Sequence, residues 1–176
     1  MRYVFGMILF CCCGFYGFSK ASGLKRRLDQ LQNFQAFFFE LKSKIRYGSV
    51  PLADICTEYR FRLAEKGESN DEMMLRFLQE LLDGLDKGET FLTTWKGGVK
   101  NVLSKSFLTE EDLYEIEKIG MNLGNEDKKT QLEWLEYYGK CLEAQTLEAK
   151  EEKQEKTGLY QKLGVIAGAF LFISIL

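Results

Sequence analysis

The two ends of the chain are apolar and uncharged, whereas the residues between them are charged throughout. Residues 3–18 read YVFGMILFCCCGFYGF and residues 163–176 read LGVIAGAFLFISIL, and neither segment contains Asp, Glu, Lys or Arg. A helix needs roughly 20 predominantly apolar residues to cross the hydrocarbon core of a bilayer, which is about 30 Å thick. The sequence therefore predicts a membrane protein with one soluble domain between two membrane-embedded ends.

We place the predicted transmembrane helices at residues 1–19 and 159–176, and the soluble domain at residues 24–158. The last segment is short, and it spans only if Lys162 reaches the interface or the bilayer thins locally. A cleaved signal peptide is the alternative for the first segment, because Ser19-Lys20-Ala21 resembles a small-x-small cleavage pattern.

The distribution of positive charge predicts that the soluble domain is cytoplasmic. Only Arg2 precedes the first apolar segment, whereas four basic residues follow it: Lys20, Lys25, Arg26 and Arg27. Four lysines precede the last segment: Lys150, Lys153, Lys156 and Lys162. Positive charge remains on the cytoplasmic side of a membrane, which argues for a retained first segment. The basic cluster would also meet anionic lipid headgroups.

Composition excludes several classes of function. The 176 residues include no histidine, which removes the usual general base and most zinc or di-iron ligand sets. The 24 basic and 26 acidic residues give a net charge of -2, unlike the basic face of a nucleic-acid-binding protein. No phosphate-binding glycine motif occurs, and the nearest fragment is Gly97-Gly98-Val99-Lys100. We expect no enzymatic activity, no cofactor, no metal and no nucleic-acid partner.

Apolar residues at helical spacing predict that the first soluble helix covers about residues 24–47. Its stripe is Leu24, Leu28, Leu31, Phe34, Phe38, Leu41 and Ile45. Phe37 and Phe39 fall outside this stripe, so we expect the helix to be buried on more than one side. Such burial favours a globular bundle over a two-stranded coiled coil.

Five further helices complete an all-α fold, which we predict to be a six-helix cytoplasmic bundle. The second begins at Pro51 and ends at Gly67, and the third opens with a capping box at residues 69–72. The fourth covers about residues 89–104, the fifth opens at Thr109, and a long sixth begins near Asn125 and enters the last apolar segment. Core positions are predicted at Cys56, Trp95 and Cys141, and Gly97-Gly98 would allow close packing.

Four motifs, in this order and spacing, resemble the stage III sporulation protein AB family of endospore-forming Firmicutes over nearly the whole chain. They are Gly17-Phe18-x-x-Ala21, Ile45-x-Tyr47-Gly48-x-x-Pro51-Leu52, Gly88 with Trp95, and Leu123-Gly124-x-x-Asp127-x-x-x-Gln131. One position departs from the family pattern, since Lys44 stands where a glutamate is usual before Ile-x-Tyr-Gly.

The resemblance implies a role in the channel that connects mother cell and forespore, in the mother-cell membrane that surrounds the forespore. It also implies a helical domain similar to the cytoplasmic domains of type II secretion and type IV pilus platform proteins. By that similarity the partners would be a cytoplasmic secretion-type ATPase and other channel subunits, and the protein itself would catalyse nothing.

Six residues from these motifs are candidates for partner binding: Tyr47, Gly48, Pro51, Leu52, Asp127 and Gln131. For the first four, the alternative is a tight turn between helices, in which Gly48 ends one helix and Pro51 begins the next. For Asp127, the alternative is helix capping. Two other classes remain open, a generic membrane-tethered helical scaffold and a regulatory enzyme.

Overall fold

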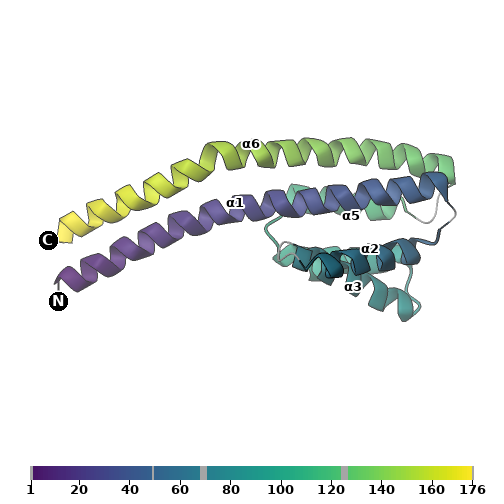
Figure 1. The fold of residues 1–176 in the computed structure, drawn as a ribbon, viewed down its shortest axis with the longest axis horizontal. Coiled ribbons are helices and arrows are strands. Elements are labelled where there is room, and N and C mark those ends of the chain that lie inside the picture. Colours follow the sequence, from purple (N-terminus) through teal and green to yellow (C-terminus); the bar gives the residue numbers. More distant parts are fainter. Residues whose placement is uncertain (1, 49, 68–70, 124–126, 176) are drawn as a thin grey trace. The chain divides into compact units, whose positions relative to one another are not determined.

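The structure is all-helical, as the sequence predicts (Figure 1). The computed structural model describes residues 2–48, 50–67, 71–123 and 127–175, and this part of the chain contains no strand. Within these described ranges, six α-helices and one short 3₁₀ helix follow one another: α1 (Arg2–Tyr47), α2 (Leu52–Lys66), α3 (Glu72–Asp86), α4 (Phe91–Asn101), η2 (Leu103–Lys105), α5 (Glu110–Met121) and α6 (Lys128–Ile175).

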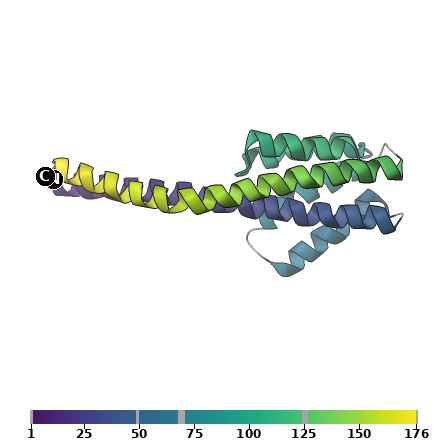
Figure 2. The same cartoon turned by 90° about the horizontal axis from the view of Figure 1, so that it is seen from above.

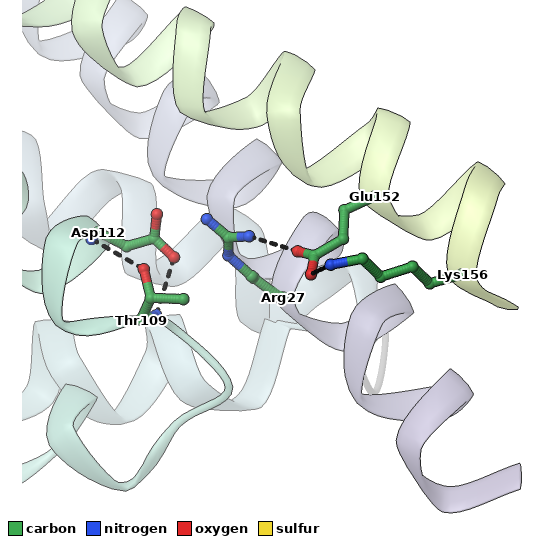
Figure 3. Close-up of polar contacts among 5 residues, drawn as sticks. All are labelled: Arg27, Thr109, Asp112, Glu152 and Lys156. Carbon is green, nitrogen blue, oxygen red and sulfur yellow. Dashed lines mark hydrogen bonds and ion pairs between the residues drawn. The ribbon is translucent and has the colours of Figure 1, made fainter. Parts of the chain in front are cut away.

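Local sequence explains several helix ends. Gly67 adopts a left-handed conformation with φ of 63° and ends α2, as predicted. Thr109 and Asp112 form a reciprocal capping box at the start of α5, in which each side chain accepts a hydrogen bond from the other residue's amide (Figure 3). The predicted caps at residues 69–70 and Asn125 lie outside the described residues.

The fourth helix is shorter than the predicted range of 89–104. Thr90 caps its start by accepting a hydrogen bond from the Thr93 amide, so α4 begins at Phe91. The α-helix ends at Asn101, and the chain tightens into η2, where the Lys105 amide donates to the Val102 carbonyl. Apolar periodicity continues across this change, which is why it did not reveal the end of α4.

The two apolar segments are not separate helices, because they continue into the first and last helices of the predicted bundle. The chain divides into two compact units that both contain parts of α1 and α6. The paired-end unit comprises Met1–Leu28 and Leu147–Leu176, and the bundle unit comprises Asp29–Thr146. Among the described residues, none of the helices combines the length and apolar character needed to cross a membrane.

Trp95 lies at the centre of the bundle unit and is almost fully buried. Its ring packs edge-on against Phe77, with 5.0 Å between centroids, and Phe37 lies 6.5 Å away. The indole Nε1 donates a hydrogen bond of 2.9 Å to the Ile116 carbonyl, which satisfies the one polar group of the side chain. The predictions that Trp95 and Phe37 belong to the core are confirmed.

Two glycines let neighbouring helices approach these rings. A Cβ atom on Gly98 would lie 2.8 Å from the Phe77 ring, and a Cβ atom on Gly120 would overlap the Trp95 ring. The predicted close packing is therefore confirmed for Gly98 but wrong for Gly97, where a Cβ atom would meet nothing within 4 Å.

Two other core predictions need correction. Phe39 is 74% exposed, because it lies with Gln32, Ala36 and Arg46 on the outward face of α1. Cys141 is only half-buried, whereas Cys56 is fully buried as predicted. Burial raises the pKa of the Cys56 thiol to about 12, so this cysteine remains protonated at neutral pH.

The two helices of the paired-end unit approach each other most closely at two glycines. A Cβ atom on Gly17 would lie 2.5 Å from the Tyr160 carbonyl oxygen, and one on Gly164 would lie 2.8 Å from the Cys13 carbonyl oxygen. Small residues at such a contact allow backbone-to-backbone packing.

A buried ion pair also joins α1 and α6 within this unit (Figure 3). Glu152 accepts hydrogen bonds of 2.8 Å from Arg27 and from Lys156. These two cations, Lys156 foremost, hold the pKa of Glu152 below its ordinary value, so the carboxylate is ionised at neutral pH. The side chain of Arg27 is 8% exposed and that of Glu152 is 25% exposed, so the pair is largely shielded from solvent.

We predict that Gly120→Ala destabilises the bundle unit by about 1–3 kcal/mol, because the new methyl group must displace the packed Trp95 ring. Gly97→Ala is the matched control, since it adds the same methyl group to a helix where nothing lies within 4 Å. This control should be neutral or stabilising by up to about 1 kcal/mol. Denaturation of the full chain followed by circular dichroism measures both, and equal effects would refute the role assigned to Gly120.

Candidate docking site at the end of the bundle unit

Four of the six candidate residues form the turn between α1 and α2. Tyr47 is the last residue of α1, and its side chain is 82% exposed. The Gly48 amide donates a hydrogen bond of 2.9 Å to the Lys44 carbonyl and so closes the helix. The Pro51 carbonyl accepts hydrogen bonds from the Asp54 and Ile55 amides and so starts α2. Gly48 and Pro51 therefore shape the turn, while Tyr47 projects into solvent.

The other two candidates lie at the start of α6. The Asp127 side chain accepts a hydrogen bond of 3.0 Å from the Thr130 amide, which is a helix N-cap. Hydrogen bonding from Thr130, through its side chain foremost and then through its backbone amide, lowers the pKa of Asp127. The Gln131 amide donates to the Asp127 carbonyl at 2.9 Å, and the Gln131 side chain is half-buried. Asp127 thus has the structural role that the sequence left as its alternative.

The bundle brings both sets of candidates to one end. The C-terminal end of α1 and the N-terminal end of α6 lie side by side in both Figure 1 and Figure 2. Glu136 of α6 joins them, because its carboxylate lies 3.2 Å from Lys42 Nζ and 3.8 Å from an Arg46 nitrogen. Lys42 in particular lowers the pKa of Glu136, so this link is charged at neutral pH.

A shallow depression of about 310 Å³ lies at this junction. Its lining residues are Arg46, Lys129, Leu132, Glu133 and Glu136. Two cations and two carboxylates around a leucine suit contact with a charged segment of another protein. We call this depression, with the α1–α2 turn and the start of α6, the docking end.

Lys44, the residue that departs from the family pattern, lies in an ion-pair network between α1 and α2. Its ammonium group contacts the carboxylate of Glu58 and lies 3.9 Å from Glu40. Arg62 of α2 contacts the same Glu40. Lys44 lowers the pKa of Glu58, and Glu40 raises the pKa of Arg62, as expected for groups that stabilise one another's charges.

A set of exposed aromatic residues on α5 and α6 was not predicted from the sequence. Tyr114, Trp134 and Tyr137 are between 40% and 59% exposed. Trp134 and Tyr137 lie off the apolar stripe of α6, and large aromatic residues off a core stripe were the available signal. Among the described residues, no group of His, Cys, Asp or Glu side chains is arranged to hold a metal ion.

The described residues form an all-helical protein in which ion pairs link α1 to α2 and α1 to α6. The family model described as "Stage III sporulation protein AB (spore_III_AB)" matches residues 2–176, and the chain belongs to this family. The family resemblance that the motifs indicate is therefore confirmed, and with it a place among stage III sporulation proteins.

A solved structure supports the same fold. The chain is similar to a protein described as "Stage III sporulation protein AB (SpoIIIAB)", with a TM-score of 0.64 and 23% sequence identity. The similarity covers 74% of this chain and 98% of that chain. A comparison with curated protein sequences gave no match.

We predict that Lys44→Glu destabilises the contact between α1 and α2, because it places a third carboxylate beside Glu40 and Glu58. Adding Glu58→Lys should recover most of the lost stability, since the reversed pair restores attraction. Lys66→Glu, at an exposed residue in the last turn of α2, is the control and should change little. Melting temperatures of the wild type and these three variants test this, and a double variant no more stable than Lys44→Glu would contradict the pairing.

Proposed function

We propose that the chain is a non-enzymatic membrane platform of the sporulation channel between mother cell and forespore. In this proposal the paired-end unit is embedded in the mother-cell membrane around the forespore. The bundle unit lies in the mother-cell cytoplasm and docks a secretion-type ATPase of the same apparatus. Membership of a stage III sporulation family supports a role in sporulation. The main support for the membrane role is the exposed surface of the paired-end unit.

That surface is apolar on both helices. Large exposed side chains of α1 include Met7, Ile8, Phe15, Tyr16 and Phe18. Those of α6 include Leu159, Leu163, Val165, Ile166, Phe170 and Ile173. A soluble protein rarely exposes so large a continuous apolar surface, whereas a lipid-embedded helix pair requires one. The positive charges at Lys20, Lys25 and Lys150 flank this surface, as expected on the cytoplasmic side.

The connection between the units supports a platform role. Both chain connections of the bundle unit run through α1 and α6, and no loop interrupts either helix at the boundary. A domain attached to a membrane through two helices has less rotational freedom than one on a single flexible linker. Such attachment suits a protein that receives position or force from an ATPase.

We predict that the chain remains in the membrane pellet of sporulating cells after alkaline carbonate washing and is released only by detergent.

A membrane-impermeant maleimide should label Cys141 only after permeabilisation, because the bundle unit is cytoplasmic in the proposal. Cys141→Ser is the matched control, and the difference between wild type and this variant isolates the half-buried Cys141 thiol. Release by carbonate would refute membrane embedding, and labelling of intact cells would refute the orientation.

We predict that the full chain, in detergent or nanodiscs, binds the sporulation ATPase with a Kd of about 1 μM or tighter, which corresponds to about -8 kcal/mol. Isothermal titration calorimetry measures this affinity, with an unrelated cytoplasmic ATPase as the control. Affinity no greater than that of the unrelated protein would refute ATPase docking. It would leave the chain as a membrane-tethered helical scaffold within the same apparatus.

A further inference from the structure

Exposed aromatic residues of α5 and α6, together with the buried Tyr138 beneath them, lie in one region of the bundle unit. We call it the aromatic surface, and it comprises Tyr114, Lys118, Trp134, Tyr137, Tyr138 and Cys141. The three rings of α6 contact one another, with centroid separations between 5.2 and 6.4 Å. On α5, the Lys118 ammonium lies 4.0 Å from the centroid of the Tyr114 ring.

A hydrogen bond between Asn122 and Tyr138 places the end of α5 beside the rings of α6, and the charges that act on Tyr137 agree with this placement. Cys141, and more weakly Glu115, raise the pKa of the Tyr137 hydroxyl, whereas Lys118 lowers it. The Asn122 side chain also donates a hydrogen bond of 3.4 Å to the Tyr138 hydroxyl. Tyr138 is only 7% exposed and supports the more exposed rings above it.

The aromatic surface lies on the side of α6 that faces α5 rather than α1. Gln145 donates a hydrogen bond to the Glu111 carbonyl of α5, while Glu136 pairs with Lys42 of α1 on the other side. Trp134, Tyr137 and Tyr114 are 40%, 58% and 59% exposed, so large rings stand in solvent on a rigid base. Tryptophan and tyrosine are the residues that most often dominate protein–protein binding energy.

The charges around these rings are mostly negative. Helix α5 carries four acidic residues that are exposed or half-buried, Glu110, Glu111, Glu115 and Glu117, and one lysine, whereas Asp112 is buried. The lysine of α5, Lys118, is already paired with Glu115 at 3.7 Å. In the described part of the chain, no ion pair engages Glu110 or Glu111. An acidic rim around exposed rings therefore complements a basic partner surface.

We propose that the aromatic surface docks an arginine-bearing face of the ATPase, a step that rests on the proposed function and names its contact surface. Arginine fits both features, because its planar guanidinium stacks on Trp and Tyr rings and also pairs with carboxylates. A lysine could pair with the carboxylates but stacks less well. The rings supply the desolvated centre of the contact, and the glutamates of α5 supply the charged rim.

Binding of the ATPase to the full chain in nanodiscs, measured by calorimetry, tests this surface. Trp134→Ala and Tyr137→Ala should each weaken the affinity at least about 10-fold, whereas Trp134→Phe should retain most of it. Phe61→Ala is the matched control, because it removes a 61%-exposed ring from α2 and should change the affinity less than about 2-fold. Glu111→Lys should weaken binding, and the wild-type affinity should fall as salt rises.

The outcomes separate this inference from the function on which it rests. If the wild type binds and the two alanine variants bind equally well, the aromatic surface is not the contact, although ATPase docking stands. If the wild type does not bind, ATPase docking itself fails, and this inference fails with it. If the alanine variants instead change the sedimentation of the chain alone, a second copy occupies the surface and the proposal is overturned. Unchanged circular dichroism melting curves exclude misfolding as the cause of any loss.

Discussion

The packing of Trp95 against the other helices is the contact on which the bundle unit depends. Its ring packs against Phe37 of α1 and Phe77 of α3, and its indole N–H donates a hydrogen bond to the Ile116 carbonyl of α5. One side chain of α4 thereby fixes the positions of three other helices. The hydrogen bond adds direction to a contact that apolar packing alone would leave free to slide.

That contact also explains which parts of the fold the sequence could predict. Helix periods, the stop at Gly67 and the capping box of Thr109 and Asp112 are local features, and each was readable within a few residues. The need for glycine at position 120 is different. It arises from the ring of Trp95, which is 25 positions earlier in the chain. The residues next to Gly120 in the sequence do not indicate that this ring packs against it. Phe39 failed as a core prediction for the same reason, since its exposure depends on which faces of α1 other helices cover.

In the candidate site too, local features could be predicted from the sequence, whereas contacts between distant residues could not. The α1–α2 turn and the cap at Asp127 could be identified from residue types, because glycine, proline and aspartate act on their own backbone. Their meeting at one end of the bundle could not, since the link through Glu136 joins residues 94 positions apart. The Lys44 network has the same character. Lys44, the position that departs from the family pattern, forms an intramolecular ion pair between α1 and α2.

The exposed aromatic residues of the two units differ in the directions in which they point around their helices. Phe15, Tyr16 and Phe18 are all more than 60% exposed, although successive residues of a helix point about 100° apart. The exposed rings of α1 therefore point in several directions, outside the face that packs against α6 at Gly17. Trp134 and Tyr137 share one side of α6, and within residues 128–143 the other exposed side chains of this helix are charged. One-sided exposure with an acidic rim is typical of a surface that a single protein partner covers.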